Sequence, residues 1–131
     1  MEVTSGPFPM KILICEQCAT TALDLWWLLH EQGHSICGIA RSTSDCLEKV
    51  AQKQPELVMV DDGLQDGLTG GSLVETLAMS GFPAVIVSWE PHRVAAGSSA
   101  RAVLQKPFTE AALASAMARV ERRDARRVAA E

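Results

Sequence analysis

Five short apolar runs alternate with stretches of helical pattern, and this alternation constrains the fold more than any other feature of the chain. Near-continuous apolar runs of strand length, rich in Val and Ile, predict parallel strands that are covered on both faces. The runs cover residues 11–15, 35–40, 56–60, 84–88 and 100–104. The helical stretches cover residues 20–32, 43–54, 71–80 and about 109–123.

Helix-capping residues stand at the ends of these helical stretches. Gly33 follows the first as a C′ glycine would, residues 42–44 offer N-caps for the second, and Thr109 precedes Glu110 at the start of the last. Because strand–helix–strand crossovers are right-handed, the pattern predicts an α/β fold with a doubly wound, five-stranded parallel sheet of order 2-1-3-4-5. Ligands of such sheets bind at the carboxyl ends of the strands.

The composition is that of one folded domain without a surface for nucleic acid. The chain has 131 residues, of which 47% are hydrophobic and 21% charged, and its net charge is −4. A negative charge gives no reason to expect binding to a phosphate backbone. No apolar run is long enough to span a bilayer and no secretion signal is present, so a cytoplasmic protein without a membrane partner is expected. Residues 1–10 are predicted to be a flexible segment.

The four cysteines raise the question of a zinc or redox site. Cys15 and Cys18 form a CxxC, but no second CxxC completes a zinc set. Cys15 closes an apolar strand pattern, Cys37 lies inside another, and Cys46 lies on a predicted helix. Packing therefore explains the cysteines better than metal binding does.

Polar side chains follow four of the predicted strands at their carboxyl ends. In chain order they are Glu16 and Gln17, Asp61 and Asp62, Ser88, and Lys106. Carboxylates that meet at one sheet edge repel each other, and a hard divalent cation such as Mg²⁺ relieves that repulsion. A lysine keeps a carboxylate ionised and, with a serine hydroxyl, binds phosphoryl oxygens. The set predicts that Asp61 is a nucleophile that accepts a phosphoryl group from an activated donor.

Over residues 11–122 the chain resembles the receiver (CheY-like) domains of two-component response regulators, which have a flavodoxin-like fold. The resemblance rests on four motifs in order, KILICEQ, PELVMVDDGLQDG, PAVIVSW and LQKPF. It implies that Asp61 is the phosphoacceptor, Ser88 the switch hydroxyl and Lys106 the phosphoryl-binding lysine. It also implies that Mg²⁺ is held by Glu16, Gln17, Asp61 and the carbonyl of Gly63.

The family resemblance further implies a single-domain response regulator that is not an enzyme in the sense of turnover. The phosphoryl donor would be a histidine kinase or a histidine phosphotransfer protein, and the output would be binding to a downstream protein, with homodimerisation left open. VDDGLQDGLTGGSL resembles receivers associated with HWE-family kinases. Residues 123–131 are expected to extend the last helix or to form a tail, and a stand-alone receiver and a piece of a larger protein remain alternatives.

The sequence departs from the family pattern at three positions and in one segment. Gln17 replaces the usual second acid, so weaker binding of Mg²⁺ is expected. Trp89 follows Ser88 where a small residue is usual, and it either covers the aspartate or packs outward. Val103 replaces the aromatic switch residue. The segment between Ser88 and Lys106 is short and rich in Pro, Gly and Ser, which predicts a shortened fourth helix.

Two other functions compete with phosphotransfer. Gln17, Trp89 and Val103 are compatible with a pseudo-receiver, a binding module that acts without phosphorylation. A flavin-binding protein of similar fold would need a glycine-containing phosphate loop after the first strand, and EQCATTA has none. In the first helix, one of the adjacent Trp26 and Trp27 is expected in the core and the other at a partner or half-buried surface.

Overall fold

A computed structural model describes residues 9–64 and 70–130 of the chain. Five parallel strands form one sheet with the order β2-β1-β3-β4-β5. The strands are β1 (Lys11–Cys15), β2 (Ser35–Ala40), β3 (Leu57–Asp61), β4 (Ala84–Ser88) and β5 (Ala102–Gln105). The predicted sheet and strand order are confirmed. Only β3 and β5 begin later than predicted, by one and two residues.

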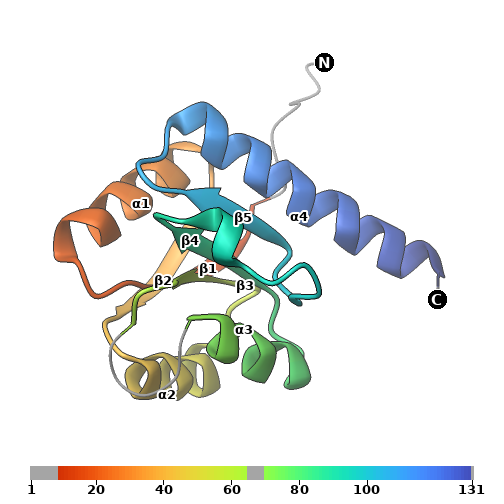
Figure 1. Ribbon diagram of the computed structural model, residues 1–131, viewed down its shortest axis with the longest axis horizontal. Helices are drawn as coiled ribbons and strands as arrows, with labels where there is room; N and C mark the ends of the chain where they lie inside the picture. The colour runs from red at the N-terminus through yellow and green to blue at the C-terminus, as the bar shows by residue number, and fades with distance from the viewer. Residues whose placement is uncertain (1–8, 65–69, 131) are drawn as a thin grey trace.

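Two helices cover each face of the sheet (Figure 1). They are α1 (Ala19–Glu31), α2 (Thr43–Lys53), α3 (Gly70–Met79) and α4 (Glu110–Ala130). Helices α1 and α4 lie on one face and α2 and α3 on the other, and α4 extends past the edge of the sheet. Between β4 and β5 stands only the three-residue 3₁₀-helix η1 (Pro91–Arg93), so the expected shortening of the fourth helix is confirmed. No helix in the described ranges is both long and apolar enough to cross a membrane.

The core explains why the strand sequences are apolar without interruption. Along β1, Ile12 and Ile14 pack into the layer under α1 and α4, whereas Leu13 and Cys15 pack into the layer under α2 and α3. Successive strand side chains point to opposite faces, and here both faces are covered by helices. All four side chains are fully buried. The sequence therefore shows no alternation of polar and apolar residues along the strand, because the side chains on both faces are apolar.

Helix ends follow the predicted capping residues. Gly33 has a φ of 96°, and the N–H groups of Gly33 and His34 donate to the carbonyls of His30 and Leu29 at 3.0 Å each. This pair of hydrogen bonds is a Schellman motif, which needs a left-handed residue at C′. At the start of α4, the Ala112 N–H donates to the Thr109 hydroxyl at 3.0 Å. Both expected caps are confirmed.

The N-cap of α2 leads to a first prediction about stability. The Ser42 hydroxyl accepts a hydrogen bond from the Asp45 N–H at 3.1 Å. We expect Ser42→Ala to lower the free energy of unfolding by about 1 kcal/mol, because that N–H loses its partner at the helix start. Urea denaturation measures the change. Ser42→Gly is the matched control and should cost only a few tenths of a kcal/mol. An alanine variant as stable as the wild type would contradict this cap.

Helix α1 offers a second prediction, which tests its buried face. Leu29 is fully buried among the side chains under α1 and α4, whereas Leu23 on the same helix is 60% exposed. We expect Leu29→Ala to lower the free energy of unfolding by about 3 kcal/mol, through lost burial and the cavity left behind. Leu23→Ala should change it by less than about 0.5 kcal/mol. Equal losses in the two variants, measured in urea, would mean that the helix packs through a different face.

Candidate functional site

The sheet topology brings the predicted polar residues to one edge. The parallel register aligns the ends of β1, β3, β4 and β5 on the same side. Glu16 follows β1, Asp61 ends β3, Ser88 ends β4 and Lys106 follows β5. These four side chains are buried at the floor of an open pocket of about 360 Å³. Its walls include Gln17, Cys18, Thr21, Asp62, Gly63, Trp89, Glu90 and Arg93.

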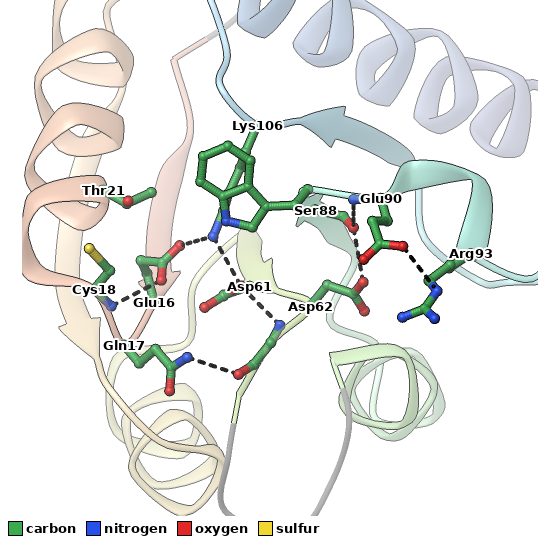
Figure 2. A pocket seen from close by; sticks show the side chains of 12 residues that line it. Glu16, Gln17, Cys18, Thr21, Asp61, Asp62, Ser88, Glu90, Arg93 and Lys106 are labelled. Atoms are coloured by element: carbon green, nitrogen blue, oxygen red, sulfur yellow. Dashed lines mark hydrogen bonds and ion pairs between the residues drawn. The ribbon is translucent and has the colours of Figure 1, made fainter.

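Lys106 joins the two carboxylates at the centre of the site (Figure 2). Its Nζ lies 2.8 Å from Oε1 of Glu16 and 3.1 Å from Oδ1 of Asp61. Lys106 is only 5% exposed, so this cation is withdrawn from water and is stabilised by the two acids. Three charged residues from three different strand ends are thereby held in one cluster.

The cluster separates the pKa values of its two carboxyl groups. Burial, together with a hydrogen bond to Asp61, raises the pKa of Glu16. Burial acts in the same direction on Asp61, but hydrogen bonds from Glu16, the Gly63 N–H and Lys106 outweigh it and lower the pKa of Asp61. For Lys106, burial lowers the pKa, but the contacts with Glu16 and Asp61 outweigh burial and raise it. At neutral pH Asp61 is therefore an ionised oxygen nucleophile beside a charged lysine.

Gln17 and Gly63 lie beside Asp61 and interact with each other. The Gly63 N–H donates to Oδ1 of Asp61 at 3.0 Å, and the Nε2 of Gln17 donates to the Gly63 carbonyl at 2.9 Å. The backbone carbonyl of Gln17 in turn accepts from Arg41 at 2.9 Å. The amide of Gln17 thus covers the carbonyl that the family resemblance implies as a ligand of the metal ion.

Ser88 is near the acidic cluster, but its hydroxyl is engaged elsewhere. It donates to Oδ2 of Asp62 at 2.9 Å and accepts from the Glu90 N–H at 2.9 Å. Glu90 also pairs through Oε2 with Nε of Arg93 at 3.2 Å. The sequence placed Asp62 at this sheet edge but did not predict its contact with Ser88, and it did not identify Glu90 and Arg93 as partners of the site.

Trp89 is an exposed part of the pocket wall, and its ring contacts Lys106 on the floor. Its ring centroid is 5.9 Å from Nζ of Lys106, which is a cation–π contact, and 65% of the residue is exposed. Trp89 and Lys106 also line a neighbouring hollow that reaches Trp27 on α1 and Phe108. Trp27 is 56% exposed, whereas Trp26 packs against the core, as expected for the two adjacent tryptophans.

The donor set fits a hard cation, with one carboxylate fewer than the sequence pattern of the family has. Glu16 and Asp61 both contact Nζ of Lys106, at 2.8 and 3.1 Å, so their oxygens converge as oxygen ligands of Mg²⁺ do. The Gly63 carbonyl is a neutral oxygen donor, and the Gln17 amide, which now presents its Nε2 to that carbonyl, carries another. The amide of Gln17 already occupies one lone pair of the Gly63 carbonyl, so it competes with a cation for that oxygen.

Residues 30–34, HEQGH, match the HExxH pattern, in which two histidines on one helix face bind zinc. Helix α1 ends at Glu31, so His34 lies beyond it, and its Nδ1 accepts a hydrogen bond from the Met10 N–H at 3.1 Å. The ring of His30 stacks on Trp26. Within residues 9–64 and 70–130, no three His, Cys, Asp or Glu side chains form a group that could hold a metal ion.

Comparisons with known proteins agree with this architecture, although no family model matches the chain. It is 30% identical over 105 residues to the phyllosphere-induced regulator PhyR of Methylorubrum extorquens, an alignment that covers 77% of this chain and 39% of that protein. The solution structure of the REC domain of the Erythrobacter litoralis PhyR response regulator superposes with a TM-score of 0.76. That match has 27% identity and covers 86% of this chain and 89% of the other.

The response regulator PhyR from Brucella abortus also superposes, with a TM-score of 0.80 and 25% identity. This match covers 97% of the chain described here but only 54% of the Brucella protein. The chain therefore spans about half the length of this PhyR, and less than half of the Methylorubrum extorquens protein.

Proposed function

Since this chain is a receiver domain of the CheY-like, response-regulator type, we propose that it accepts a phosphoryl group on Asp61 and signals by binding a downstream protein. The observation that carries this proposal is the position of Asp61 at the end of β3, 3.1 Å from Nζ of the buried Lys106. A carboxylate in this position is a nucleophile with a cation already in place for the charge that it receives.

The proposed donor is a phosphohistidine on a histidine kinase or a phosphotransfer protein. An oxygen of Asp61 attacks the phosphorus, the phosphorus–nitrogen bond breaks, and the imidazole leaves with the bonding electron pair. Lys106 stabilises the charge on the phosphoryl oxygens throughout, and Ser88 is the second side chain near enough to donate to one of them. No residue has to remove a proton from Asp61, because the lowered pKa leaves it ionised.

Mg²⁺ is proposed as the cation of this reaction, held by Glu16, Asp61, Gln17 and the Gly63 carbonyl. When bound it neutralises charge on the transferred phosphoryl group. Because Gln17 contributes no charge and already donates to Gly63, we expect Mg²⁺ to bind more weakly than to a site with a third acid.

A second candidate is the pseudo-receiver, which binds its partner without phosphorylation. The observation that favours it is the amide of Gln17, which occupies the Gly63 carbonyl at 2.9 Å. Incubation with Mg²⁺ and acetyl phosphate, followed by intact mass measurement, separates the two functions. A gain of one phosphoryl group supports phosphotransfer. An unchanged mass, with no spectral response to Mg²⁺, supports the pseudo-receiver.

Association with an HWE-family kinase, homodimerisation and a cytoplasmic location stay predictions from the sequence. The fold and the relatives are those of a regulator, so we propose signalling and not substrate turnover as the output.

A further inference from the structure

The hydroxyl of Ser88 is committed to two partners, and neither is Asp61. It donates its one proton to Oδ2 of Asp62 and accepts from the Glu90 N–H, both at 2.9 Å. Ser88 is buried, and in Figure 2 its contact runs to the Asp62 side of the pocket, away from the contacts of Lys106. A hydroxyl has a single donor, so Ser88 cannot donate to a group on Asp61 while it donates to Asp62.

The same hydroxyl connects the pocket to the turn that replaces the fourth helix. Glu90 is the N-cap residue of η1, and its carboxylate pairs with Arg93 in that turn. Arg93 lines both the Asp61 pocket and a neighbouring hollow of about 730 Å³ between α3 and the segment after η1. A continuous chain of contacts therefore runs from Asp62 through Ser88 and Glu90 to Arg93.

We infer that Asp62 is a positioning residue that holds the Ser88 hydroxyl away from Asp61 until Asp61 is phosphorylated. This inference rests on the proposed function. A phosphoryl oxygen on Asp61 competes with Asp62 for the proton of Ser88, and the movement of that hydroxyl withdraws the acceptor from the Glu90 N–H at the start of η1. The η1 turn is the element that responds, because the N–H of its N-cap residue Glu90 donates to Ser88.

The first test measures binding of beryllofluoride, a phosphoryl mimic, in the presence of Mg²⁺ to four proteins: wild type, Asp62→Ala, Ser88→Ala and the double variant. Asp62→Ala also removes a negative charge, so it should tighten binding somewhat in both backgrounds. If Asp62 holds Ser88, the gain should be about tenfold larger when Ser88 is present, because a hydrogen bond to a charged group no longer has to be broken. Equal gains in the two backgrounds would overturn the inference.

The second test needs no ligand. In ligand-free Asp62→Ala, the Ser88 hydroxyl is free to turn, so the NMR resonance of the Glu90 amide should shift. Glu75→Ala is the matched control, because Glu75 holds Ser99 at 2.8 and 2.6 Å on the far side of the same segment. Glu75→Ala should leave the NMR resonance of the Glu90 amide unchanged. An unmoved Glu90 amide in Asp62→Ala would refute the contact between Asp62 and Ser88.

The two tests also distinguish failure of this inference from failure of the proposed function. If neither beryllofluoride nor acetyl phosphate modifies any of the proteins, phosphorylation of Asp61 is wrong, and release of Ser88 by phosphorylation is wrong with it. In that case the Glu90 amide still reports whether Asp62 holds the hydroxyl. If the wild type binds beryllofluoride but Asp62→Ala tightens binding equally with and without Ser88, only the role of Asp62 is wrong.

Discussion

Asp61→Asn protein is expected to gain no phosphoryl group from acetyl phosphate and Mg²⁺ under conditions in which the wild type gains one. Asparagine preserves the size of the side chain, but its amide oxygen is neutral and is not a nucleophile toward phosphorus at neutral pH. The variant should remain folded, since asparagine keeps the side-chain size and Lys106 retains its ion pair with Glu16 at 2.8 Å. Intact mass spectrometry measures the outcome directly.

Asp62→Asn is the matched control for this experiment. Asp62 is the next residue and lines the same pocket, yet its carboxylate is directed to Ser88 and not to Lys106. The control should still gain one phosphoryl group. If Asp61→Asn is modified, or if the mass gain is lost in Asp62→Asn instead, Asp61 is not the acceptor.

Replacing Lys106 with methionine should have the second largest effect, on both stability and phosphorylation. Its ammonium is the cation that Glu16 and Asp61 share inside the pocket, at 2.8 and 3.1 Å. Removing one partner of a buried ion pair leaves uncompensated charge, so we expect the free energy of unfolding at pH 7 to fall by about 3 kcal/mol. Loss of a charge-stabilising donor should slow phosphorylation by about 100-fold or more.

The loss of stability in Lys106→Met should depend on pH. Without the ammonium, the pKa values of both carboxyl groups rise in the folded protein, and the folded state then holds protons that the unfolded chain releases above its ordinary Glu value of 4.5. A raised pKa in the folded state makes stability fall as pH rises. The difference from wild type, measured by urea denaturation, should be small near pH 4 and should grow toward pH 7.

Lys49→Met tests whether removal of any paired lysine has this effect. Lys49 pairs with Asp45 on the partly exposed surface of α2. Exposed pairs of this kind contribute little, so we expect a change below about 0.5 kcal/mol with no marked dependence on pH. A similar loss in the two variants would argue that Lys106 is not held between two buried acids.

The sequence by itself determined the fold and the central residues of the site. Its apolar runs have strand length and its helices carry recognisable caps, such as Ser42 and Gly33. Parallel strands with right-handed crossovers leave few topologies, and every topology of this kind places the strand ends at one edge. The proximity of Glu16, Asp61 and Lys106 could therefore be predicted from the sequence, because each residue directly ends or follows a strand.

Only the tertiary structure decided which hydrogen bonds form where a polar side chain has several possible partners nearby. Ser88 ends β4 at the same edge, but whether its hydroxyl meets Asp61 or Asp62 depends on rotamers and on the path of the chain through Glu90. The amide of Gln17 likewise covers the Gly63 carbonyl, a contact between residues 46 positions apart. The periodicity of the sequence indicates which helix or strand a residue lies on. The choice of a hydrogen-bond partner depends on distances of a few ångströms, and these are set by packing among elements that are distant in the sequence.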